Sequence, residues 1–97
     1  TNNGARGRDG APGPDAANPR AGNSMGHILR WREEGGFAGT RFAWRHFVLA
    51  GDPANARAEA RGNVKGDAFA NPDGLMVDPR GWLWVQTDMS PRAMGQG

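Results

Sequence analysis

The residues best suited to chemistry are oxygen-bearing side chains in the last third of the chain. Asp73 stands in the sequence Asn71-Pro72-Asp73-Gly74. Pro72 fixes the backbone before it and Gly74 permits a close approach after it, so the carboxylate is aimed rigidly. A rigid carboxylate suits a hard cation, which needs fixed oxygen donors. Pro-Asp-Gly is also a common turn sequence in which the Asp bonds nearby backbone amides, so a structural role stays open.

Further oxygen donors lie near Asp73 or at the start of the chain. Asp67 and Asn71 flank the same loop, and Asp88 ends the apolar run that follows. Asn2 and Asn3 carry amide oxygens near the amino terminus. Each has an ordinary alternative, a solvent edge for Asp88 and a turn for the two asparagines. Spacing alone does not decide between these roles.

The histidines and tryptophans favour structural roles. His27 and His46 fall in expected strands, without a nucleophile pattern or a third metal ligand at a telling spacing. The tryptophans occupy alternating strand positions, which is typical of packing on a sheet face rather than stacking on bases or sugars. They are Trp31, Trp44, Trp82 and Trp84.

Residues 27–34 and 41–51 are predicted to form two strands joined by the turn-rich segment 35–40. Apolar and polar residues alternate in both, with Phe42, Trp44, His46 and Val48 expected on one face of the second. A helix is the competing prediction for 41–50, because some apolar residues also recur at helical spacing. Flanking glycines, aromatic enrichment and the short length favour a strand.

A second hairpin is predicted over residues 68–88, with its strands at 75–78 and 82–88. Asp78-Pro79-Arg80-Gly81 has the chemistry of a type I turn, in which Asp78 caps the turn and Gly81 tolerates a left-handed backbone at its exit. Residues 82–88 alternate, with Trp82, Trp84, Gln86 and Asp88 on one face.

The chain is expected to be all-β, with two strand pairs at 27–51 and 67–90 and long loops at 1–26 and 52–66. Its 97 residues include 16 glycines and 7 prolines, which lie mostly in those loops. Two hairpins about forty residues apart suggest one to two blades of a β-propeller. A piece of this kind leaves strand edges unpaired and has little core, so we expect that it does not fold alone.

Composition excludes several classes of function. The net charge is only +2 and the arginines are interspersed with acids, which disfavours a nucleic-acid binder. Without cysteine there is no disulfide or thiolate site. No apolar run has the length of a membrane span, and no signal peptide is present. The chain begins with Thr1, so we expect an internal or carboxyl-terminal-half fragment.

The order of motifs resembles the PhoX-type alkaline phosphatases over essentially the whole chain. The motifs are "TNN", "DAANPRAGN", "GHILRWREEGG", "RFAWRHFVLAGDP" and "KGDAFANPDGLMVDPRGWLWVQTDMS". The resemblance implies part of a six-bladed propeller enzyme that hydrolyses phosphomonoesters with clustered calcium (Ca2+) and iron (Fe3+) ions. It also implies twin-arginine export to the periplasm or outside, and a parent that is a monomer without a membrane span.

The same resemblance implies that Asp73 is a calcium ligand, with Asn71 close behind it. Asp88 and Asn3 are secondary candidates for metal ligation. The cysteine, the glutamates and the arginine that the family uses for iron and phosphate are absent here, so the piece alone should be inactive. Met76-Val77 stands where relatives commonly carry an aromatic pair, which concerns packing.

Two other functions compete with this interpretation. A calcium-dependent propeller enzyme of the gluconolactonase kind shares the Pro-Asp-Gly hairpin but does not account for the first fifty residues. A non-catalytic propeller blade that serves protein interaction would bind no metal.

Overall fold

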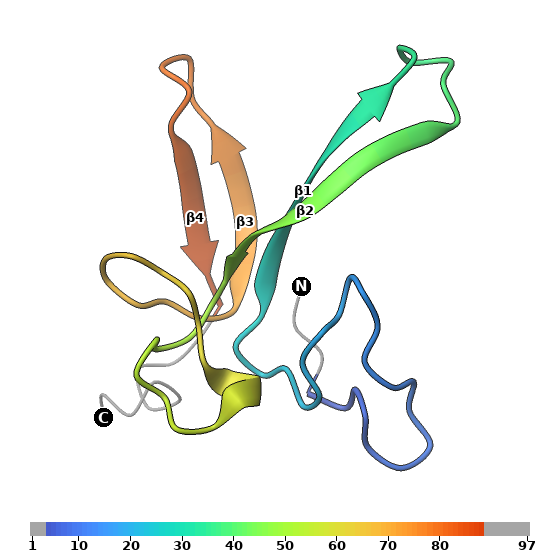
Figure 1. Cartoon of the computed structure of the whole chain (residues 1–97). Helices are drawn as coiled ribbons and strands as arrows, with labels where there is room; N and C mark the ends of the chain where they lie inside the picture. The colour runs from blue at the N-terminus through green and yellow to red at the C-terminus, as the bar shows by residue number, and fades with distance from the viewer. Residues whose placement is uncertain (1–3, 89–97) are drawn as a thin grey trace.

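The computed structural model describes residues 4–88, and these form two separate antiparallel hairpins held by loops. Strand β1 (His27–Glu34) pairs with β2 (Arg41–Leu49), and β3 (Pro72–Val77) pairs with β4 (Leu83–Thr87). One turn of 3₁₀ helix, η1 (Ala58–Ala60), lies in the connection between them (Figure 1). The all-β prediction is confirmed, and residues 41–49 form a strand rather than a helix.

The first hairpin contains a bulge that the sequence pattern did not predict. Trp31 lies opposite Trp44 along a regular stretch, but the register shifts between Ile28 and Leu29. Ile28 lies opposite Val48, which leaves Phe47 as the extra residue on β2. A bulge of this kind moves every later side chain to the other face. The expectation that Val48 shares a face with Trp44 was therefore wrong.

The turn of the second hairpin forms as its residues predict. The Gly81 amide donates to the Asp78 carbonyl at 2.9 Å, and Gly81 has φ of +84°. The Asp78 carboxylate accepts hydrogen bonds from the Arg80 amide at 2.8 Å and the Trp82 amide at 3.1 Å. It also accepts one from the Trp84 indole at 3.0 Å, and this bond, with those from Arg80 and Trp82, lowers the pKa of Asp78 to about 2. The Arg80 guanidinium lies 4.2 Å from the Trp82 ring centre, a cation–π contact that adds to the hydrogen bonds of the turn.

The bases of the two hairpins are joined by backbone hydrogen bonds, which we call the basal junction. The Ala50 amide donates to the Gly26 carbonyl at 3.0 Å, the Gly51 amide to Phe69 at 2.8 Å, and the Asn71 amide to Met25 at 2.7 Å. The small apolar core lies at the same place and consists of Met25, Ile28, Ala50, Ala60 and Ala70. The junction thus fixes where β3 begins relative to β1 and β2.

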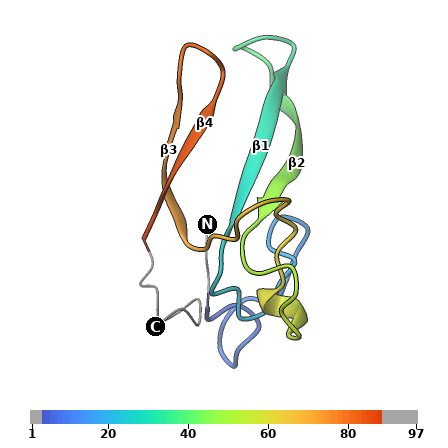
Figure 2. The ribbon, with the colours of Figure 1, turned by 90° about the vertical axis from the view of Figure 1, so that its left-hand side faces the viewer.

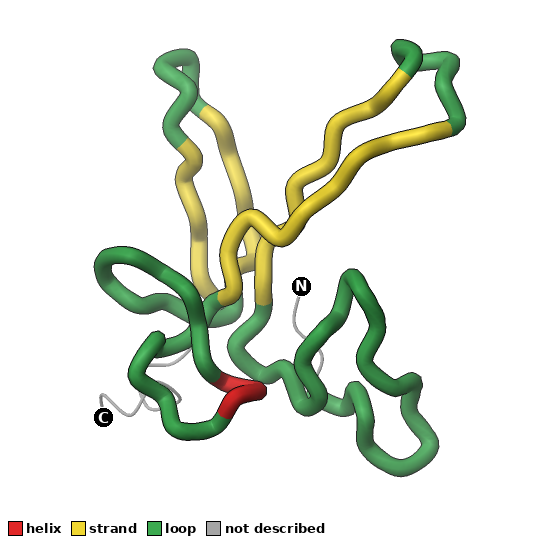
Figure 3. Tube along the Cα trace, in the orientation of Figure 1, coloured by secondary structure: helices red, strands yellow, loops and turns green. Residues whose placement is uncertain are grey.

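Arg20 is a buried residue that adds side-chain hydrogen bonds to the basal junction. Its side chain is 7% exposed, and its guanidinium donates to the carbonyls of Ala50 at 2.9 Å, Arg61 at 3.1 Å, and Gly26. Burial lowers its pKa. Arg20 lies in the loop predicted over residues 1–26, but it is buried there. Residues 4–26 have no helix or regular strand (Figure 3). The hydrogen bonds of Arg20 nevertheless tie this loop to the hairpin bases.

Two glycines allow the backbone to cross itself beside the junction. A Cβ on Gly51 would collide with the Ala60 carbonyl oxygen, and one on Gly62 would collide with the carbonyl oxygens of Gly51 and Leu49. Gly51 also has φ of +115°. Only glycine fits at these two positions, and the end of β2 can therefore lie against the segment that follows η1.

Away from the junction the two hairpins diverge and leave large apolar side chains exposed (Figures 1 and 2). Such exposure matches the expectation that these residues alone bury too little surface for a full core. The exposed side chains are Trp31, Phe37, Phe42, Trp44, Phe47, Leu75, Met76, Val77, Trp82 and Trp84. That this piece does not fold unaided stays a prediction.

Candidate metal centre

Asn71 is the residue through which the candidate centre is attached to the fold. Its backbone is in the left-handed region, with φ of +50°, which asparagine tolerates better than most residues. Its amide is bound to Met25 in the basal junction, and β3 starts at the next residue, Pro72. The half-buried Asn71 therefore sets the point from which Asp73 projects.

Asp88 lies beside Asn71 at the same end of the second hairpin. The Asp88 amide donates to the Asn71 carbonyl at 2.9 Å, and the Asn71 side-chain amide lies 3.4 Å from the Asp88 carbonyl. The next pair along the hairpin is Pro72 of β3 with Thr87 of β4. The structure thus brings together two candidates that are seventeen residues apart in the sequence.

Asp73 follows Pro72 on β3 and is exposed. The register of the hairpin is irregular between Pro72 and Leu75, and a Cβ on Gly74 would lie 3.0 Å from Oε1 of Gln86. The backbone after Asp73 is therefore packed closely against the neighbouring strand, as the glycine there predicts.

The Asp73 carboxylate makes no hydrogen bond or ion pair to any residue within 4–88. The structural alternative, in which it bonds nearby backbone amides, is not seen in that part of the chain. Asp78 shows the contrast, because its carboxylate is fully engaged by its own turn. Of the two aspartates, Asp73 is the one with oxygen atoms available to a ligand.

The candidate residues at this end of the second hairpin carry oxygen donors. They are carboxylate and amide oxygens, which a hard cation prefers, and Ca²⁺ takes about six to eight of them. Within residues 4–88 no three or more His, Cys, Asp or Glu side chains cluster closely enough to hold a metal ion. The described residues therefore do not assemble a complete metal site by themselves. Asp67 is exposed on its loop, and Asn3 lies outside the described residues.

His27 and His46 have the structural roles that the sequence favours. His27 is fully buried, and its Nδ1 accepts a hydrogen bond from the Asn23 side chain at 2.9 Å. Burial, with smaller contributions from nearby positive charge, lowers the pKa of His27 to about 4. The His46 ring lies 5.3 Å away, and its Nε2 is 3.1 Å from the Ala17 carbonyl. Neither imidazole is placed as a base in the candidate centre.

The described residues include no helix that is long and apolar enough to span a membrane.

The four tryptophans lie on strand faces or at a turn, as expected. Their side chains are largely exposed, so they contribute less packing to these sheets than predicted.

Comparison with known proteins assigns the chain to a family. The sequence profile described as "Alkaline phosphatase PhoX" matches residues 1–96. The structure is similar to that of Pseudomonas fluorescens PhoX in complex with vanadate, a transition state analogue, with a TM-score of 0.81 and 42% sequence identity. That match covers 93% of this chain and 16% of the Pseudomonas chain. No curated protein sequence matches significantly. The chain belongs to the PhoX family of alkaline phosphatases.

Proposed function

We propose that this chain is part of a phosphomonoesterase that hydrolyses phosphate esters with the help of bound metal ions. The observation that carries the proposal is the family match over residues 1–96, together with 42% identity to a PhoX protein whose structure holds a transition state analogue. The chain spans about one sixth of that protein's length. The two hairpins then form one to two blades of a six-bladed propeller.

Within this enzyme, Asp73 is proposed to hold a calcium ion with Asn71 close by. Three observations support the assignment: the Asp73 carboxylate is exposed, it is unused within residues 4–88, and its backbone is fixed by a basal junction that also orders Asn71. Asp88 is a further candidate because its backbone is bonded to Asn71. A bound cation neutralises phosphate oxygens and stabilises the charge that develops in the transition state. Asp73 contributes negative charge and position, and it acts neither as a nucleophile nor as a proton donor.

The remaining features of the proposed enzyme lie outside the described residues. Iron ions would take their ligands elsewhere, because no cysteine occurs in the chain and residues 4–88 assemble no iron site. Export by the twin-arginine route to the periplasm or outside, and a monomeric parent, complete the proposal. Its substrate is a small phosphomonoester rather than a nucleic acid or a membrane component.

The test is a phosphatase assay on the full-length protein that carries this segment, with Asp73→Asn as the variant. We expect activity to fall at least about tenfold and to need more calcium for half-maximal rate, because a neutral amide binds Ca²⁺ more weakly than a carboxylate. Asp9→Asn is the matched control, since Asp9 is an exposed aspartate in the amino-terminal loop. It should leave rate and calcium response unchanged.

Unchanged activity and calcium response in Asp73→Asn would remove this residue from the metal centre. Absence of any phosphatase activity in the metal-loaded parent would instead remove the proposed function. The two failures are distinct, because the second appears in the unmodified protein.

A further inference from the structure

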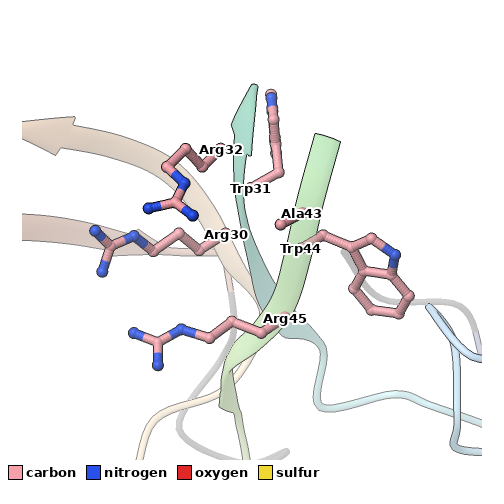
Figure 4. A pocket seen from close by; sticks show the side chains of 6 residues that line it. All are labelled: Arg30, Trp31, Arg32, Ala43, Trp44 and Arg45. Atoms are coloured by element: carbon pink, nitrogen blue, oxygen red, sulfur yellow. The ribbon is translucent and has the colours of Figure 1, made fainter. Parts of the chain in front are cut away.

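One face of the first hairpin is lined by arginines. Arg30 lies directly opposite Arg45 across the two strands, and Arg32 follows on the same face of β1. The side chains of these three residues, which we call the arginine face, leave the hairpin on one side while Trp44 leaves on the other (Figure 4). All three are exposed. The sequence alone did not indicate this cluster, because Arg30 and Arg45 become neighbours only through the cross-strand register.

The charges of the arginine face are not balanced by carboxylates in the described part of the chain. Within residues 4–88, no carboxylate lies within 4 Å of Arg30, Arg32 or Arg45. Glu34, at the far end of the same face, lies opposite a fourth arginine, Arg41. Like charges placed directly opposite each other destabilise a sheet. An anion bound between the facing arginines would offset this repulsion.

A second group of arginines, near the amino-terminal loop, lies close to carboxylates. Arg6 is 3.2 Å from Asp15, and Arg57 is 4.0 Å from Glu59. Arg6, Arg57 and Glu59 line one pocket at the amino-terminal loop, together with Arg8. Carboxylates compensate the charge in that region, whereas no carboxylate of residues 4–88 lies within 4 Å of the three arginines of the arginine face.

The arginine face also borders an apolar groove between the hairpins. The groove has a volume of about 370 Å³ and is lined on one side by Ile28 and Phe47, and on the other by Leu75 and Leu83. Arg30 stands at its edge. Guanidinium groups bind phosphate through paired N–H donors, and the groove provides apolar surface next to them.

We propose that the arginine face binds the phosphate group of small organic phosphates, with Arg30 and Arg45 as the principal donors. The opposed guanidiniums of these two residues share one anion, and Arg32 adds a third positive charge. The inference does not depend on the phosphatase activity, because it concerns binding alone.

The experiment is a calorimetric titration of the full-length protein with orthophosphate and, separately, with the non-hydrolysable phenylphosphonate. The variant is Arg30→Gln/Arg45→Gln, and the control is Arg8→Gln/Arg57→Gln, which removes the same charge elsewhere. We expect the variant to lose one binding site per chain, or to bind there at least about tenfold more weakly. The control should keep both the number of sites and their affinity. Tighter binding of phenylphosphonate than of orthophosphate would identify the organic phosphate as the ligand and the groove as part of the site.

Three results would overturn the proposal. The first is an unchanged number of sites in the variant, which places all anion binding elsewhere. The second is a lower Tm of the anion-free variant, which shows that the arginines pair with carboxylates in the rest of the protein; removing two facing like charges should otherwise hold or raise Tm. The third is tighter binding of a DNA or RNA oligonucleotide that the same variant abolishes, which identifies a nucleic-acid surface.

Discussion

Arg20 gives the sharpest test of how the loops hold the two hairpins. The substitution Arg20→Met keeps much of the side-chain volume but removes every donor. Two of its three acceptors belong to buried residues. The Ala50 carbonyl would lose its guanidinium partner, whereas the Gly26 carbonyl would keep the hydrogen bond from the Ala50 amide. The third acceptor is the carbonyl of Arg61, an exposed residue, and water can replace the guanidinium there.

The magnitude follows from those acceptors. Leaving the buried Ala50 carbonyl unsatisfied costs about 1–3 kcal/mol, and losing one of the two hydrogen bonds to the Gly26 carbonyl costs about 0.5–1.5 kcal/mol more. Burying the guanidinium is itself unfavourable, as its lowered pKa shows, so part of this cost is recovered when the charge is removed. We expect a net loss of about 2 kcal/mol in the free energy of unfolding. Arg20→Lys should lose less, because an ammonium can still serve one or two of the carbonyls.

The assay is urea unfolding of the full-length protein, followed by tryptophan fluorescence. The matched control is Arg8→Met, which changes an exposed arginine of the same loop and should alter stability by less than about 0.5 kcal/mol. A loss below about 1 kcal/mol in Arg20→Met would refute the reasoning. It would show that water replaces the guanidinium and that the basal junction does not depend on it.

Two further predictions concern the same junction. The pKa of His27, about 4, lies below the 6.5 of an unfolded histidine, so its contribution to stability is present above pH 6.5 and is lost as the pH falls toward 4. The loss is at most about 3 kcal/mol, and unfolding measured between these pH values should be less pH-dependent in His27→Gln; an identical dependence would contradict it. Gly62→Ala places a Cβ against the Gly51 carbonyl and should cost about 1–3 kcal/mol in unfolding free energy, whereas Gly13→Ala, in open space, should cost little. Equal stability of these two glycine variants would show that the backbone crossing relaxes freely.

Local signals in the sequence were sufficient for the strands and for one turn. Alternation of apolar residues located β1, β2 and β4, and the Asp78–Gly81 turn formed with the bonds that its residues predict. These features depend on interactions between residues that are close together in the sequence. Short segments are therefore sufficient to predict them. The β3 strand begins at Pro72, earlier than predicted, because its pairing with Thr87 is set by the partner strand.

Only part of the candidate metal centre could be predicted from the sequence. The rigid setting of Asp73 follows from Pro72 and Gly74, and its designation as a metal ligand stays a proposal. The structure added the bonds between Asn71 and Asp88, which lie on different strands, and the left-handed backbone of Asn71. Neither has a signal in the intervening residues.

The sequence by itself determined which segments become strands and where one hairpin turns. Only the tertiary structure decided what holds those hairpins together, because the decisive partners are distant: Arg20 meets carbonyls thirty and forty-one residues away. The same holds for the bulge at Phe47, which the alternating pattern conceals, and for the facing arginines, which become neighbours only through the register. Spacing along the chain records the period of a strand, but cross-strand register and buried carbonyls are properties of the folded chain.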